Sequence, residues 1–214
     1  HRNPVAQSPR RNVTVAPALH KVDQTPDGIV IVTKRTLIAI EHIKLPGNNG
    51  GCRYPINANK EVSDLLEKIR GTACVKMGFA KDLQDATDNQ PAVPKVGFVT
   101  VPSSYDDIEK GHADAADMDI CARVISVFKC HKACPLTSAS SIAVAAMLDG
   151  SIVNEIVKPA EGQKTIRIGH PSGVMTMVPT VIRHGDDMKN AEVPGVAVQR
   201  TARRIMDGYV YIRD

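Results

Sequence analysis

Short runs of β-branched residues alternate with two longer segments of helical periodicity along this chain. The β-branched runs predict strands within residues 28–43, 93–101, 119–127, 164–168 and 174–182. A further segment, residues 60–80, carries apolar side chains at steps of three and four, which predicts an amphipathic helix with Asn59 as its N-cap. The predicted buried face of this helix comprises Val62, Leu65, Leu66, Ile69, Ala73 and Met77.

Residues 137–148 form the second helical pattern, which is apolar nearly all round after its first turn. A helix of this kind is buried on every side, and the pair Asp149-Gly150 predicts its end. Near the end of the chain, Asp207-Gly208 separates two short apolar runs, 202–206 and 209–212. An Asp-Gly pair between such runs predicts a β-hairpin.

The composition limits how the core is built. Hydrophobic residues make up 43% of the 214 residues, aromatic residues only 3%, and tryptophan is absent. A chain of this length forms one large domain or two small ones, and aliphatic side chains must fill its core. Residues 1–27 contain several prolines and arginines and predict an N-terminal arm or linker, which leaves residues 28–214 as a single lobe.

The formal net charge of +4 is mild. It favours an anionic small molecule as partner, and without a basic motif interleaved with aromatic residues it argues against nucleic acid. No stretch approaches 18 consecutive apolar residues, so we expect no membrane span. The five cysteines form an odd set and no secretory signal precedes them, so we expect thiols in the cytoplasm, with the mitochondrion as the other option.

The segment Gly169-His170-Pro171-Ser172-Gly173 separates two of the predicted strands. A glycine-flanked turn exposes successive backbone N–H groups, which suit a carboxylate or phosphate. Ser172 adds a hydroxyl and His170 a titratable imidazole. The plainer alternative is an ordinary β-turn, because proline and glycine punctuate such turns.

A second segment that suits an anion precedes the predicted buried helix. Lys129, His131 and Lys132 lead into a first turn that is rich in hydroxyl side chains, and a helix start offers free N–H groups and the positive end of its dipole. The alternative is that the hydroxyls are structural caps and the lysines a solvated surface pair. If this helix start faces the turn of residues 169–173, the two together suit a di- or tricarboxylate.

Cys130-His131-x-x-Cys134 also permits a zinc interpretation. The motif has no clear second pair of ligands, so we expect no metal and treat the cysteines as structural thiols. A nucleophilic pairing of Cys130 with His131 is disfavoured, because neighbours on a strand point to opposite faces.

Five blocks of sequence, in their order and spacing, resemble the second (C-terminal) half of the methylaconitate isomerase (PrpF) family. They are LEKIRGTACVKMGFA (residues 66–80), PAVPKVGFVTVP (91–102), DICARVISVFKCHKACPLTSASSIAVAA (119–146), IGHPSGV (168–174) and VQRTARRIMDGYV (198–210). The resemblance implies an α+β fold, one lobe of the two-lobed diaminopimelate epimerase type. In such a lobe a mixed or antiparallel sheet wraps around a central buried helix, here residues 137–148.

The resemblance also implies a chemistry. Members of the family act on aconitate, methylaconitate, methylitaconate or oxalomesaconate, and they move a proton across an allylic system without metal or organic cofactor. A base removes a C–H proton next to a carboxylate, fixed donors hold the dienolate charge, and the conjugate acid returns the proton at the far carbon. We therefore expect an isomerase of unsaturated tricarboxylates with no cofactor.

The candidate catalytic residues are His170 first, then Lys129 and His131, with Lys132 as a further alternate. The candidate substrate-binding residues are Thr137, Ser138, Ala139, Gly169, Ser172 and Gly173. By resemblance, His170, Ser172 and Gly173 contact the substrate carboxylates, and the start of the central helix adds N–H donors.

Departures from the family pattern open alternatives. The Arg-Gly-Gly-Thr-Ser and Cys-Gly-Asn motifs and the lysine of the family's N-terminal lobe have no counterpart here, and Phe128 and Ser138 each replace a glycine. One hypothesis is an isomerase completed by a missing lobe or a second subunit, and another is a catalytically silent single-lobe relative that binds an anion or a protein. A homodimer fits both, because a lone lobe exposes an apolar face. An amino-acid epimerase is a third hypothesis, although no partner cysteine is evident.

Overall fold

The structure is a computed structural model. It describes the backbone of residues 11–15, 19–25, 28–33, 37–40, 57, 60–109, 111–184, 191–200 and 205–209, and side chains within 57–199 and 205–209 apart from the gaps in that list. Among these residues no helix is both long and apolar enough to cross a membrane.

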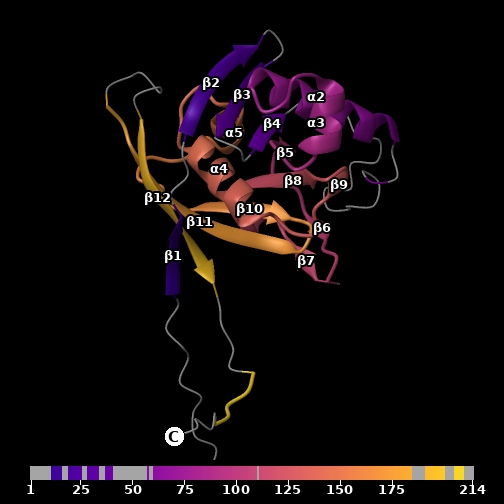
Figure 1. Ribbon diagram of the computed structural model, residues 1–214. Helices are drawn as coiled ribbons and strands as arrows, with labels where there is room; N and C mark the ends of the chain where they lie inside the picture. The colour runs from indigo at the N-terminus through magenta and orange to yellow at the C-terminus, as the bar shows by residue number, and fades with distance from the viewer. Residues whose placement is uncertain are drawn as a thin grey trace, which may run out of the picture.

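A curved mixed sheet forms most of the fold (Figure 1). Its strand order is β1-β12-β11-β10-β8-β5-β4, and β9 pairs with β8 beside that path. The strands are β1 (Arg11–Val15), β4 (Leu37–Ile40), β5 (Lys95–Thr100), β8 (Ile120–Ser126), β9 (Lys129–Cys130), β10 (Ile166–His170), β11 (Gly173–Ile182) and β12 (Glu192–Arg200). The pairs β4–β5 and β8–β10 are parallel and the others antiparallel, so the predicted mixed sheet is confirmed.

Helix α4 (Leu136–Ala146) lies inside the curve of this sheet (Figure 1). It contacts β12, β11, β10 and also β4, which lies near the other end of the strand order, so the sheet must curl around the helix. The residues from Ser138 to Ala146 are all buried, as expected for a helix that is apolar nearly all round. Gly150 follows with φ +76. The predicted central helix and the α+β fold class are thus confirmed.

Smaller elements complete the described part of the fold. They are β2 (Leu19–Thr25), which pairs with β3 (Gly28–Thr33), β6 (Tyr105–Asp106), which pairs with β7 (His112–Ala113), the 3-10 turn η1 (Ala115–Asp117) and the short helix α5 (Ile152–Val157). Within residues 1–27, the predicted arm, β1 pairs with β12 and β2 with β3. The domain boundary at residue 27 stays a prediction.

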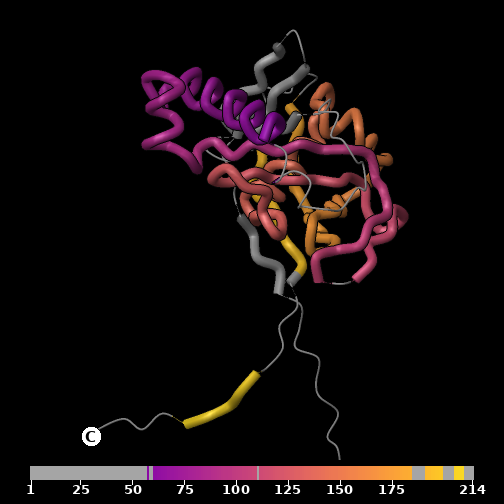
Figure 2. Tube along the Cα trace, turned by 90° about the vertical axis from the view of Figure 1, so that its right-hand side faces the viewer, coloured from indigo at the N-terminus to yellow at the C-terminus, as the bar shows by residue number. Residues whose placement is uncertain are grey.

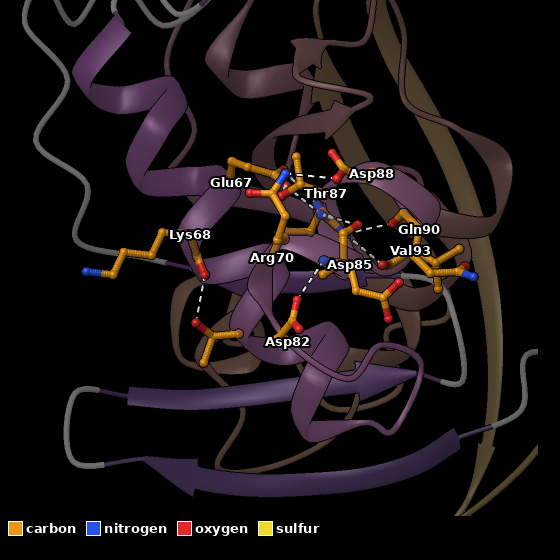
Figure 3. A network of polar contacts seen from close by, with 12 residues as sticks. Glu67, Lys68, Arg70, Asp82, Asp85, Thr87, Asp88, Gln90 and Val93 are labelled. Atoms are coloured by element: carbon orange, nitrogen blue, oxygen red, sulfur yellow. Dashed lines mark hydrogen bonds and ion pairs between the residues drawn. The ribbon is translucent and has the colours of Figure 1, made fainter.

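Helices α2 (Lys60–Lys76) and α3 (Leu83–Asn89) lie together at the β5 end of the sheet, away from β12 (Figures 1 and 2). Arg70 of α2 holds them in place (Figure 3). Its buried guanidinium binds Glu67 and donates to the carbonyls of Ala86, Gln90 and Val93, at 2.8 to 2.9 Å. One side chain therefore joins α2, α3 and the segment that enters β5.

The predicted face of α2 is partly wrong. Val62 and Leu66 are buried as expected, but Leu65 is 47% exposed. Arg70 and Cys74 are buried instead, because α3 and the segment before β5 cover the flank of α2 that carries them. Asn59, the predicted N-cap, lies outside the described residues.

The predicted C-terminal hairpin, with its two runs 202–206 and 209–212, lies largely outside the described residues. Residues 205–209 contain no strand, and Ile205, Met206 and Tyr209 are each more than four-fifths exposed. Asp207 instead accepts a hydrogen bond from the N–H of Gly208, a local contact that does not need a paired strand.

Candidate functional site

The turn of residues 169–173 is a tight hairpin connection between β10 and β11. His170 pairs with Gly173, so Pro171 and Ser172 form its tip. Gly173 has φ +115, a conformation that favours glycine. Gly169 is constrained differently, because a Cβ there would lie 2.5 Å from the sulfur of Met118 and 3.1 Å from the Tyr105 hydroxyl.

Two residues from another segment of the chain, Tyr105 and Ile108, form hydrogen bonds to this turn. The Tyr105 hydroxyl lies 2.6 Å from the carbonyl oxygen of His170 and 2.9 Å from that of Gly173, so one phenol bridges both ends of the turn. Burial raises the pKa of Tyr105 to about 12, so the phenol keeps its proton as a donor at neutral pH. The N–H of Ile108 donates to the Pro171 carbonyl at 2.9 Å. The turn is therefore held from Tyr105 and Ile108 as well as by its own strands.

The turn and the segment that leads into α4 lie together, as the sequence predicts. The Ser172 hydroxyl donates to the Lys132 carbonyl at 2.6 Å, and Lys132 is four residues before the first residue of α4. The hydroxyl proton of Ser172 is used in this contact, so the hydroxyl oxygen can only accept a further hydrogen bond. The backbone N–H of Ser172 donates to Nδ1 of His170. Ser172 thus joins the two segments that the sequence predicts to bind an anion, and it is not a free hydroxyl donor.

The imidazole of His170 is buried, with 7% of the residue exposed. Burial first, and then the charges of Arg123 and His131, lower its pKa to about 4, and Asp107 opposes this shift. The ring is therefore uncharged at pH 7. Its Nδ1 accepts the N–H of Ser172 at 3.2 Å, which assigns the ring proton to Nε2. His170 can donate one hydrogen bond from Nε2, but it is a weak base at neutral pH.

The first turn of α4 offers fewer hydrogen-bond donors for an anion than the sequence predicts. Pro135 is the N-cap and supplies no side-chain cap, so the N–H groups of residues 136–138 have no partner within the helix. Thr137 is exposed, whereas the Ser138 hydroxyl is buried and has no hydrogen-bond partner among the described residues. Ala139 is fully buried and its N–H donates to the Pro135 carbonyl at 2.8 Å, so it is turned inward.

The remaining hydroxyls of α4 serve the helix itself. Those of Ser140 and Ser141 donate to the carbonyls four residues earlier, each at 2.9 Å. This back-bonding is common for serine inside helices. Thr137 is thus the solvent-accessible hydroxyl in this turn, and Ser138 lies just behind it.

The alternate catalytic candidates are exposed. Lys129 ends the turn of the β8–β9 hairpin, and His131 follows β9 with its Nδ1 3.1 Å from the N–H of Ala133. At the tip of that hairpin, Val127 and Phe128 have φ values of +50 and +64 and exposed side chains. Phe128, where the family pattern has a glycine, thus adopts a backbone conformation that favours glycine, at a cost in strain.

Arg123 and Tyr105 contribute to this site, and the sequence analysis missed both. Arg123 lies on β8, is 3% exposed, and donates from Nη1 to the carbonyls of Ala122 at 2.7 Å and Gly169 at 3.1 Å. Its guanidinium carbon is 4.9 Å from the centroid of the Tyr105 ring. A lone arginine within the apolar run ICARVIS was the available signal, because a charge in a buried strand needs specific partners. Nothing in the sequence around Tyr105 indicates its role.

Four cysteines fall within the described residues, and all are buried: Cys74, Cys121, Cys130 and Cys134. Burial raises the pKa of Cys134 to about 12, so its thiol is unreactive at neutral pH. Cys130 is buried while His131 is exposed, the alternation expected of neighbours on a strand. Within the described part of the chain no three His, Cys, Asp or Glu residues gather as a metal site.

Known proteins match most of this chain in sequence and in structure. The PrpF protein family profile matches residues 25–213. The chain belongs to the PrpF family. A crystal structure of methylitaconate-delta-isomerase matches 90% of the chain with a TM-score of 0.72 and 31% identity, and the match covers 49% of that protein.

Relatives in the PrpF family are named as isomerases. The chain is 37% identical over 158 residues to 3-methylitaconate isomerase of Eubacterium barkeri, covering 73% of this chain and 40% of that protein. It is 30% identical over 157 residues to 2-methyl-aconitate isomerase of Shewanella oneidensis, covering 73% and 38%. The chain thus spans about two fifths of the length of these PrpF relatives.

Proposed function

We propose that this chain is the carboxylate-binding lobe of an isomerase that shifts the double bond of unsaturated di- or tricarboxylates, such as aconitate or methylaconitate, by proton transfer without a cofactor. The contact that supports this proposal is the hydrogen bond from the Ser172 hydroxyl to the Lys132 carbonyl. It brings the turn of residues 169–173 next to the start of α4, so that two anion-binding elements lie side by side. The names of the relatives support the reaction class.

Each group of this lobe has a defined part in the proposed reaction. The free N–H groups at the start of α4, together with Thr137, hold one carboxylate, and the turn holds a second through the Nε2 proton of His170. These donors stabilise the charge that develops on a dienolate when the allylic proton leaves. The buried Ser138 hydroxyl has no hydrogen-bond partner among the described residues, so it would gain one from a carboxylate oxygen that reaches it.

His170 is a better donor than base in this scheme. A group with a pKa of about 4 is protonated in only about one molecule in a thousand at pH 7, and it withdraws a proton from carbon poorly. Lys129 and His131 are exposed and have no contact with the turn among the described hydrogen bonds. We therefore propose that the base comes from a second lobe, which a further part of the protein or a second copy of this chain supplies.

Deuterium exchange tests the reaction. We expect trans-aconitate in D2O to acquire deuterium at the allylic carbon in the presence of this chain, measured by proton NMR. Binding of trans-aconitate, measured by calorimetry, is expected to weaken about tenfold in Ser172→Ala, since a lost hydrogen bond of this kind costs about 1.4 kcal/mol. Thr180→Ala is the matched control, because Thr180 is an exposed hydroxyl on β11 away from the turn.

The outcomes of these two assays separate the hypotheses. Binding without exchange would contradict a second copy of this chain as the source of the base. It would leave two alternatives, a base on a further part of the protein or a silent anion-binding relative. Absence of binding would contradict the carboxylate site itself. A homodimer is expected if a second copy completes the site, with Val127 and Phe128 as its exposed apolar contacts, and a strict monomer in sedimentation at assay concentration would contradict that part.

A further inference from the structure

We propose that Arg123 is a positioning residue, which fixes the turn of residues 169–173 and the ring of His170 in the geometry that receives a carboxylate. This inference rests on the proposed function for its purpose, but its structural basis is independent of any ligand. Arg123 lies on β8, the parallel neighbour of β10. Because Arg123 is buried, it contacts the start of the turn from the interior of the fold.

The contacts of Arg123 reach the turn by two routes. The direct route is the hydrogen bond from Nη1 to the carbonyl of Gly169, the residue before His170. The indirect route passes through Tyr105, because the guanidinium lies over the Tyr105 ring at 4.9 Å. The Tyr105 hydroxyl in turn contacts the carbonyls of His170 and Gly173. A cation over an aromatic face at this distance is attracted to it, so Arg123 holds the ring that bridges the turn.

The close packing at Gly169 supports this arrangement. The space next to its Cα is occupied by the sulfur of Met118 and the hydroxyl of Tyr105. The turn has no room to move toward Met118 and Tyr105, and the hydrogen bond from Arg123 holds the Gly169 carbonyl. These contacts together restrain the backbone that leads into His170.

Charge is the second effect of Arg123 on His170. Three ionisable groups face the imidazole: Arg123 from β8, Asp107 from the segment between β6 and β7, and His131 from the segment before α4. Arg123 and His131 disfavour the imidazolium, and Asp107 favours it. Because Arg123 is always charged and buried, its field acts on His170 at every pH of interest. Burial is the larger cause of the lowered pKa of His170, and Arg123 adds to it, so the ring stays neutral and its Nδ1 can accept the Ser172 N–H.

A histidine NMR titration of the full chain tests this proposal without a ligand. In the wild type we expect His170 to stay neutral down to about pH 5. In Arg123→Met we expect the His170 pKa to rise, because a positive neighbour is lost, and the Ser172 amide to exchange with solvent about tenfold faster. The matched control is Arg183→Met, which removes an exposed arginine just beyond the other end of β11. Unchanged titration in R123M, or an equal shift in R183M, would overturn the proposal.

Two further variants separate charge from geometry. Tyr105→Phe removes the hydroxyl bridge but keeps Arg123, so we expect a low His170 pKa with faster exchange at Ser172. Arg123→Lys keeps the charge but lacks the planar guanidinium fork, so it should show the same pattern. This variant decides the proposal if R123M does not fold. Unchanged Ser172 exchange in R123K would contradict the positioning role.

Calorimetry with trans-aconitate links this role to the proposed function. In R123K we expect the dissociation constant to rise about tenfold, with the circular dichroism spectrum unchanged. Wild-type affinity in R123K would contradict the positioning role. If wild-type protein does not bind trans-aconitate, the proposed function fails, while the titration and exchange results still decide whether Arg123 positions the turn.

Discussion

Replacement of Gly169 by alanine should destabilise the protein and impair carboxylate binding together. The new Cβ would lie 2.5 Å from the Met118 sulfur, 3.2 Å from the Met118 methyl carbon and 3.1 Å from the Tyr105 hydroxyl. Met118 is 3% exposed and its sulfur is already 3.3 Å from that of Cys121. Tyr105 is held by two backbone carbonyls. Neither neighbour can move without breaking a contact.

The cost of this substitution follows from its packing. Inserting a methyl group into a filled site costs about 1–3 kcal/mol, and we expect the free energy of unfolding in urea to fall by about 2 kcal/mol. Displacement of Tyr105 also removes the bridge across the turn, so the affinity for trans-aconitate should fall as well. Gly208→Ala is the matched control, since nothing lies within 4 Å of a Cβ at Gly208.

A second substitution checks the mechanism. Met118→Ala in the G169A background removes the closest clash, so the double variant should regain part of the affinity relative to G169A, although its own cavity lowers stability. The reasoning is refuted if G169A is as stable as the wild type and binds trans-aconitate equally well. That result would mean that the turn tolerates displacement and that Met118 and Tyr105 do not hold it in place.

Three other predictions concern stability. Because the pKa of His170 is low, the unfolded chain binds a proton that the folded chain does not; the free energy of unfolding is therefore full above the unfolded pKa of 6.5 and falls as the pH is lowered toward about 4, by up to about 3 kcal/mol. Urea unfolding at pH 7 and 4.5 should show this loss, and His170→Gln should reduce it. The same pH dependence in His170→Gln would contradict the assignment. Arg70→Met should lower the free energy of unfolding by about 3–5 kcal/mol, because it leaves Glu67 and three carbonyls without their donor; exposed Lys76→Met on the same helix is the control, and an equal effect of both would exclude the network as the cause. Ser151→Ala should cost about 1–2 kcal/mol in the same assay, because Ser151 caps α5 and donates to the Ala145 carbonyl at 2.6 Å, and a loss no larger than that of exposed Ser104→Ala would contradict this role.

Short-range sequence patterns were enough to predict much of the fold. The strands β5, β8, β10 and β11 and the central helix α4 follow from β-branched runs and an all-round apolar segment, and both act over short stretches of chain. The turn of residues 169–173 and the helix start were also found from sequence. Their convergence on one anion site stays a hypothesis, and the contact between Ser172 and Lys132 places the turn beside the segment that leads into α4.

Long-range packing accounts for what the sequence did not indicate. Leu65 fits the helical face of α2 by spacing, but the position of α3 buries Arg70 and leaves Leu65 exposed. Tyr105 reaches the turn across 65 residues of chain, and no periodicity records such a contact. The low pKa of His170 likewise depends on burial and on Arg123, which pairing of strands brings close.

The central claim is that the turn of residues 169–173 and the start of α4 bind one carboxylate ligand together. Titration of the isotope-labelled chain with trans-aconitate, followed by backbone amide NMR, tests it most directly. We predict that the amides of Ser172 and Gly173 and those of Leu136, Thr137 and Ser138 shift with a single dissociation constant, which acetate does not reproduce. Shifts confined to one of the two segments, or different constants for the two, would contradict the claim.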